Sequence, residues 1–95
     1  MQVRILRRHI TKARDLIPKY NAVQLSYRAL HCPIAQAVKE KFPDCEVVVN
    51  GQDTKLTCNG IKTTYRNEIN ARGFIDHFDQ SREVKPITVT LTEQK

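Results

Sequence analysis

The chain has 95 residues, of which 40% are hydrophobic and 27% are charged, and its formal net charge is +6. This length suits one domain with a modest core, and the composition is that of a globular protein rather than a disordered one. No apolar run approaches the roughly 20 residues of a membrane-spanning helix, and the amino-terminal segment lacks the apolar stretch of a signal peptide, so membrane insertion and secretion are not expected.

The positive charge is concentrated in the first third of the chain. Residues 1–30 contain seven basic side chains and one acidic one, whereas residues 31–95 contain nine of each. We expect a single domain made of a basic segment (1–30), a main α+β core (31–92) and a short tail (93–95). A basic segment beside a neutral body predicts an anionic partner, although a solvated surface that serves only solubility explains the same charge.

Hydrophobic periodicity gives the expected elements of the first third. Residues 2–7 read as a strand, because apolar residues alternate with arginines there. Thr11 can cap a short helix over residues 11–20, which Pro18 interrupts near its end. Residues 21–30 fit a helix and a strand equally well, so that segment is left open.

The stretch from Leu30 to Asp44, LHCPIAQAVKEKFPD, predicts the central helix. Pro33 suits the first helical position, where its missing N–H has no partner to lose, and Pro43 ends the helix. The apolar face consists of Ile34, Ala37, Val38 and Phe42, and the wet face of Lys39, Glu40 and Lys41.

Three strands within residues 45–66 are expected to follow as a meander. Asn59-Gly60 is a strong hairpin signal, because both residues tolerate positive φ. A helix over about 67–79 comes next, and Gly73 inside it would allow close packing. The inward face of this helix is expected to consist of Ala71, Phe74, Ile75 and Phe78. A last strand is expected over residues 87–91, with Ile87, Val89 and Leu91 on its inward side.

These elements predict a small α+β protein built as a two-layer sandwich. The sheet is expected to be antiparallel and to contain the amino-terminal strand, the meander and the carboxy-terminal strand. Two main helices and a short amino-terminal helix would cover it.

The closing residues and the helix start resemble a family of small tailed-phage proteins. The shared patterns are CPIAQAV, a Cys-Pro-Ile/Val-Ala helix start, and GFIDHFDQSREVKPITVTL, which is similar to a closing FI..FD.G....PF.F.L pattern. The match covers roughly residues 10–91. The chain departs from the family at Gln80-Ser81, where the family has glycine, and at Ile87, where it prefers an aromatic residue. The resemblance implies a phage accessory protein acting in the bacterial cytoplasm, with no assigned activity and no catalytic residue.

The three cysteines predict free thiols. Cys32, Cys45 and Cys58 are odd in number and far apart in sequence, which suits a reducing cytosol better than a disulfide framework. Cys32 lies at a helix start, where the helix dipole lowers a thiol's pKa, and His31 could act as its base. Cysteine is also among the most buried residue types, and no third group that would orient the histidine is evident. We therefore favour a buried Cys32 in a protein that is not an enzyme, with a Cys32-dependent enzyme as an alternative.

No metal or cofactor is expected. The cysteines and histidines lack the paired spacing of zinc sites, and no glycine-rich phosphate loop is present. His77, with Asp76 and Asp79 on either side, reads as the wet face of a helix rather than as an acid–base site.

The candidate anion-binding residues lie in the first third of the chain. They are Arg4, Arg7, Arg8, Lys12, Arg14, Lys19, Tyr27 and Arg28, with the tyrosine available for base stacking. Nucleic acid is the first candidate partner, because the charge is spread along the segment. A nucleotide-type ligand is second, since it needs the same arginines but a concave pocket, which two subunits of a homo-oligomer could form. An inhibitor that docks on a host protein is a further alternative, and one possible role is to antagonise host defence.

Overall fold

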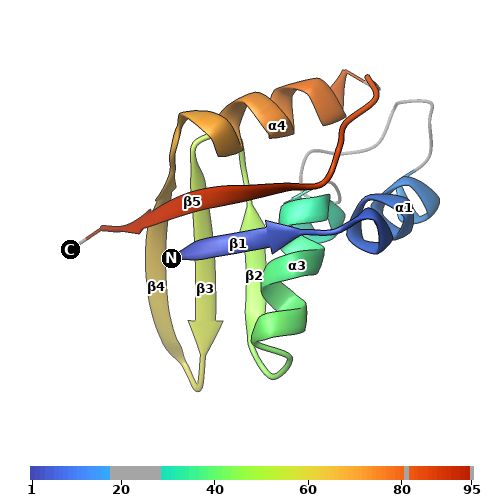
Figure 1. Ribbon diagram of the computed structural model, residues 1–95. Helices are drawn as coiled ribbons and strands as arrows, with labels where there is room; N and C mark the ends of the chain where they lie inside the picture. The colour runs from blue at the N-terminus through green and yellow to red at the C-terminus, as the bar shows by residue number, and fades with distance from the viewer. Residues whose placement is uncertain (18–28, 81, 95) are drawn as a thin grey trace.

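The computed structural model describes residues 1–17, 29–80 and 82–94 (Figure 1). Its elements are β1 (Gln2–Ile5), α1 (Arg7–Leu16), α3 (Pro33–Lys41), β2 (Glu46–Val49), β3 (Asp53–Cys58), β4 (Ile61–Asn67), α4 (Ile69–Asp79) and β5 (Ile87–Glu93). The predicted α+β class is confirmed, with all five predicted strands in one antiparallel sheet. No helix within the described residues is long and apolar enough to cross a membrane.

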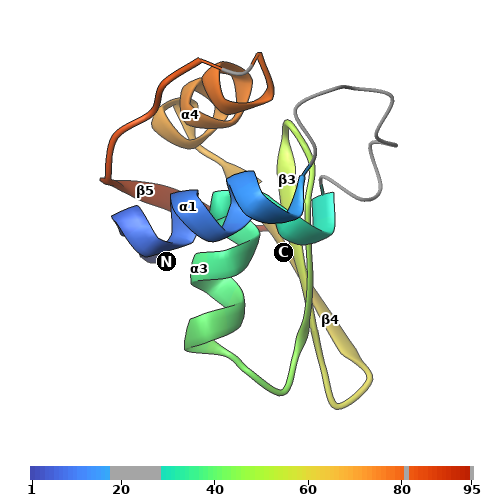
Figure 2. The same ribbon diagram turned by 90° about the vertical axis from the view of Figure 1, so that its right-hand side faces the viewer.

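The sheet has the strand order β1-β5-β4-β3-β2 and curls strongly. In Figure 1, β5 and β1 cross in front of β2, β3 and β4, and α4 lies along one end of these strands. Helix α3 contacts both edge strands, β1 and β2, so it fills the open side of the curl. Helix α1 packs beside α3, as the turned view in Figure 2 shows.

The core forms where the helices meet the concave face of the sheet. Its largest fully buried apolar side chains are Ile5, Ile34, Val38, Val89 and Leu91. The predicted inward faces of α3 and α4 are confirmed, except that Phe42 is only half-buried at the end of α3. The basic segment also contributes buried residues, namely Val3, Ile5, Ile10 and Ala13, so it is part of the packed body.

The predicted β3–β4 hairpin is confirmed. Asn59 and Gly60 have φ values of 52° and 79°, as a two-residue turn of this kind requires. The close packing expected at Gly73 is wrong, because a Cβ built there would meet nothing within 4 Å.

Helix α1 begins earlier than predicted. It starts at Arg7, β1 ends at Ile5, and Thr11 lies inside the helix rather than capping it. The side chain of His9 makes the early start possible, because its Nδ1 accepts the backbone N–H of Leu6 at 2.9 Å. The ambiguous segment lies mostly in 18–28, outside the described residues.

The prediction of free thiols at Cys45 and Cys58 is wrong, because the two sulfurs form a disulfide. Strands β2 and β3 pair Glu46 with Thr57, so the cysteines face each other one position further along. Their Cα atoms are 4.6 Å apart, as expected for a non-hydrogen-bonded antiparallel pair. Cys32 is the free cysteine.

A buried amide holds the β2–β3 turn. Asn67, which is fully buried at the end of β4, accepts the hydroxyl of Thr54 at 2.7 Å and donates to the carbonyl of Asn50 at 2.8 Å. Asn50 in turn accepts the backbone N–H groups of Gln52 and Asp53 through its side chain. The amide of Asn67 therefore links three segments that meet at one end of the sheet.

Candidate anion-binding surface

The structure describes five of the eight predicted anion-binding residues. Arg4 extends from β1, and Arg7, Arg8, Lys12 and Arg14 lie on α1. The remaining three predicted residues, Lys19, Tyr27 and Arg28, fall outside the described residues.

Arg14 and Arg7 contact the chain around the carboxy-terminal end of α4. The guanidinium of Arg14 donates to the carbonyl oxygens of Phe78, at 3.3 Å, and Arg82, and it stacks 4.1 Å from the centre of the Phe78 ring. Arg7 donates to the carbonyl oxygen of Val84 at 3.4 Å. Both side chains therefore help to hold α1 against the segment that leads into β5, a structural role that the sequence did not indicate.

Arg8 belongs to an ion pair with α3. Its Nη2 donates to Glu40 Oε1, and its Nε donates to Oε2 at 3.3 Å. The buried His9 approaches the same carboxylate, with Nε2 3.0 Å from Oε2. Because Nδ1 of His9 accepts the N–H of Leu6, the neutral ring carries its proton on Nε2 and donates it to Glu40. These donors, with Arg8 as the main cause, lower the pKa of Glu40 to about 2.

Two adjoining hollows lie on either side of Glu40. We call the first, of about 420 Å³, the α1 hollow; it is lined by Arg8, His9, Lys12, Gln36, Lys39, Glu40 and Pro43. We call the second, of about 300 Å³, the β1 hollow; it is lined by Gln2, Val3, Arg4, Leu6, His9, Ala37, Glu40 and Lys41. Within the part of the chain that the structure describes, five cationic side chains and one carboxylate therefore line a continuous surface formed by three elements.

Two of these cations were missed in the sequence analysis. Lys39 and Lys41 were assigned to the wet face of the central helix, and they are exposed as predicted. Their proximity to Arg4, Arg8 and Lys12 depends on how α1 and β1 pack against α3, and no local sequence signal reports that packing.

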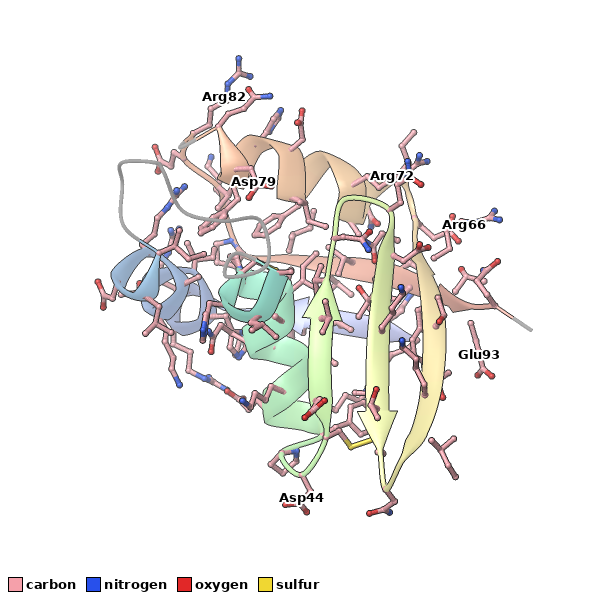
Figure 3. All side chains as sticks on the ribbon, turned by 180° about the vertical axis from the view of Figure 1, so that it is seen from behind. Asp44, Arg66, Arg72, Asp79, Arg82 and Glu93 are labelled. Atoms are coloured by element: carbon pink, nitrogen blue, oxygen red, sulfur yellow. A yellow bond between two sulfur atoms is a disulfide. The ribbon has the colours of Figure 1, made fainter. Side chains whose placement is uncertain are left out.

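A second group of basic residues lies on the convex face of the meander. The strand register puts Lys55 of β3 on the same face as Lys62 and Arg66 of β4, opposite the buried Leu56. In the rear view of Figure 3, Arg66 projects at the end of the molecule away from α1. This face provides three cations that do not line the two hollows.

The interpretation of Cys32 as a buried residue is confirmed. It is 4% exposed and caps α3 through its sulfur, which accepts the N–H of Ala35 at 3.4 Å. Burial raises the pKa of the thiol to about 12, outweighing the backbone hydrogen bonds that lower it. A small hollow of about 130 Å³ lies beside it, bordered by Asn50 and Asp79, but a neutral thiol is a poor nucleophile there.

The remaining candidate chemistry lies on α4. Asp76, His77 and Asp79 are exposed, as predicted for a wet helix face. Within the described ranges, no three histidine, cysteine, aspartate or glutamate residues are close enough to hold a metal ion.

Comparison of the chain with protein-family models, with curated proteins and with solved structures found no match.

Proposed function

We propose that this chain is a non-enzymatic binding protein that holds the phosphate backbone of a nucleic acid across β1, α1 and α3. The observation that carries the proposal is the convergence of Arg4, Arg8, Lys12, Lys39 and Lys41 on the α1 and β1 hollows. Lysine and arginine contacts to phosphates supply most non-specific affinity for nucleic acids.

The shape of the surface favours a polymer over a nucleotide-sized ligand. Cations from three elements line two hollows rather than one enclosed pocket, whereas small-ligand sites bury most of the ligand among apolar side chains. Among the residues that the structure describes, no phenylalanine or tyrosine lines either hollow, so binding is expected to depend on the backbone phosphates rather than on the base sequence.

The biological setting is proposed from the resemblance to small phage proteins. We propose an accessory protein that acts in the bacterial cytoplasm, where binding to nucleic acid could antagonise a host defence system. Reducing systems in the cytoplasm would open the Cys45–Cys58 disulfide, so binding should be measured with the disulfide intact and with it reduced.

Fluorescence anisotropy with a labelled 20-nucleotide oligothymidylate and a labelled 20-base-pair duplex tests the binding proposal. The key variant is Lys12→Gln/Lys39→Gln/Lys41→Gln, which removes three charges from the hollows. The matched control is Lys55→Gln/Lys62→Gln/Arg66→Gln, which removes three charges from the convex face. Circular dichroism would confirm that both variants fold.

Binding by the wild-type protein at about 50 mM salt should weaken as salt increases. For the single strand, the hollow variant should reduce the slope of log K against log salt by about 2, since each lost phosphate contact contributes about 0.7. The control should retain most of the slope. Absence of wild-type binding at low salt, or equal losses in the two variants, would overturn the proposal.

A further inference from the structure

Glu40 lies on the ridge between the two hollows. On α3, Gln36 and Lys39 line the α1 hollow, whereas Ala37 and Lys41 line the β1 hollow. Glu40 lines both, because its position on the helix falls between these two faces. The surface therefore has cations on both sides of a single central carboxylate.

The central carboxylate is fixed in position. Arg8 contacts both of its oxygens, and the Nε2–H of His9 donates to Oε2. His9 is itself buried and is held by Leu6, so one anchored donor and the exposed Arg8 keep Glu40 on the ridge. The lowered pKa of Glu40 means that it also keeps its negative charge above about pH 2.

An ion pair without net charge between two groups of cations imposes a spacing on any anion that binds. Arg8 balances the charge of Glu40, so a phosphate directly over this pair gains no net attraction, whereas one in either hollow is attracted by Lys12 and Lys39 or by Arg4 and Lys41. In a nucleic-acid strand, a neutral sugar separates successive phosphates, so the sugar can lie over the ridge. An inorganic triphosphate has no such neutral segment.

We propose that Glu40 divides the surface into two phosphate sites and thereby selects the separated phosphates of a nucleic-acid strand over a compact polyphosphate. This inference rests on the proposed function and specifies the ligand class of the same surface. It makes Glu40 a specificity residue that acts by cancelling the charge of Arg8 at the centre of the surface.

Competition against a labelled oligothymidylate tests the inference. Unlabelled oligothymidylate and inorganic triphosphate are compared at equal phosphate concentration, with the wild-type protein, with Glu40→Gln and with the control Glu93→Gln. Glutamine keeps an oxygen that can accept hydrogen bonds from Arg8 and His9. Glu93, an exposed residue of β5, lines neither hollow, projects at the end of the molecule away from α1 in Figure 3, and provides the same change in charge.

With the wild-type protein, triphosphate should compete at least about tenfold less well than the oligonucleotide, a factor that corresponds to the loss of one modest charge attraction. Glu40→Gln should remove most of that difference, and Glu93→Gln should leave it unchanged. Failure of the wild-type protein to bind the labelled strand would overturn the proposed function. Normal strand binding would leave the function standing but overturn the role of Glu40 if triphosphate competes equally with the wild type, or if Glu40→Gln leaves the ratio unchanged.

Discussion

Reduction of the Cys45–Cys58 disulfide should lower the free energy of unfolding by about 3 kcal/mol. The bond joins residues 13 positions apart, and the loss of chain entropy in the unfolded state corresponds to about 3 kcal/mol for a loop of this length. Small domains have a total stability of about 5–15 kcal/mol, so this is a large fraction. The melting temperature should fall by about 10 °C or more.

Urea unfolding followed by circular dichroism, with and without a phosphine reductant, measures this loss. Alkylation in urea followed by mass spectrometry should count one thiol per chain before reduction and three after it. The variant Cys45→Ser/Cys58→Ser should unfold at the same urea concentration in both conditions. If three thiols are labelled but the urea midpoint of the wild-type protein does not move, the disulfide contributes nothing to stability and the predicted loss of about 3 kcal/mol is wrong.

Three other predictions follow from buried or paired groups. Asn67→Leu should destabilise the fold by about 2–5 kcal/mol in urea unfolding, because it leaves the Thr54 hydroxyl and a carbonyl unpaired, and adding Thr54→Val should recover part of the loss. Cys32 should resist iodoacetamide at pH 8 in the native protein and react in urea, since burial raises its pKa to about 12; rapid native labelling would contradict its burial. The pKa of Glu40 is lowered to about 2 from 4.5, so its contribution to stability is complete above pH 4.5 and disappears as the pH falls towards 2. Melting temperatures over that range should therefore fall more for the wild type than for Glu40→Gln, and parallel curves would show that the pairing with Arg8 adds no stability.

Elements with strong local signals could be predicted from the sequence. The turn at Asn59-Gly60 needs positive φ at both positions, and few other residue pairs supply it, so the hairpin was identified correctly. The Cys32-Pro33 start of α3 was also identifiable, because proline suits the first helical position. Amphipathic periodicity was sufficient to predict which residues of α4 are buried.

Features that depend on tertiary pairing could not be predicted in the same way. The start of α1 depends on His9, which is not a usual capping residue, so Thr11 gave the more familiar signal. The disulfide depends on the register of β2 against β3, and a shift of one residue would put the two cysteines on opposite faces. The sequence did contain a signal for the disulfide, because Cys45 and Cys58 stand at the outer ends of the two predicted strands that form the β2–β3 hairpin.

The candidate site was likewise predictable only in part. Composition located the positive charge in the first third of the chain, and Arg4, Arg8 and Lys12 of that segment do line the hollows. The lysines of α3 and the central Glu40 joined them only through packing. Arg14 matched the composition equally well but is used to hold α4.

The pairing of β1 with β5 has a consequence for biosynthesis. Met1 and Leu91 exchange backbone hydrogen bonds across 90 positions of the chain. The amino-terminal strand, with the apolar Val3 and Ile5, therefore leaves the ribosome long before its partner strand exists. Such a non-local pairing is expected to make folding slow and to place completion of the sheet after synthesis of β5. A nascent chain stalled before residue 87 would expose an unpaired strand edge, which makes it a candidate for chaperone binding or aggregation.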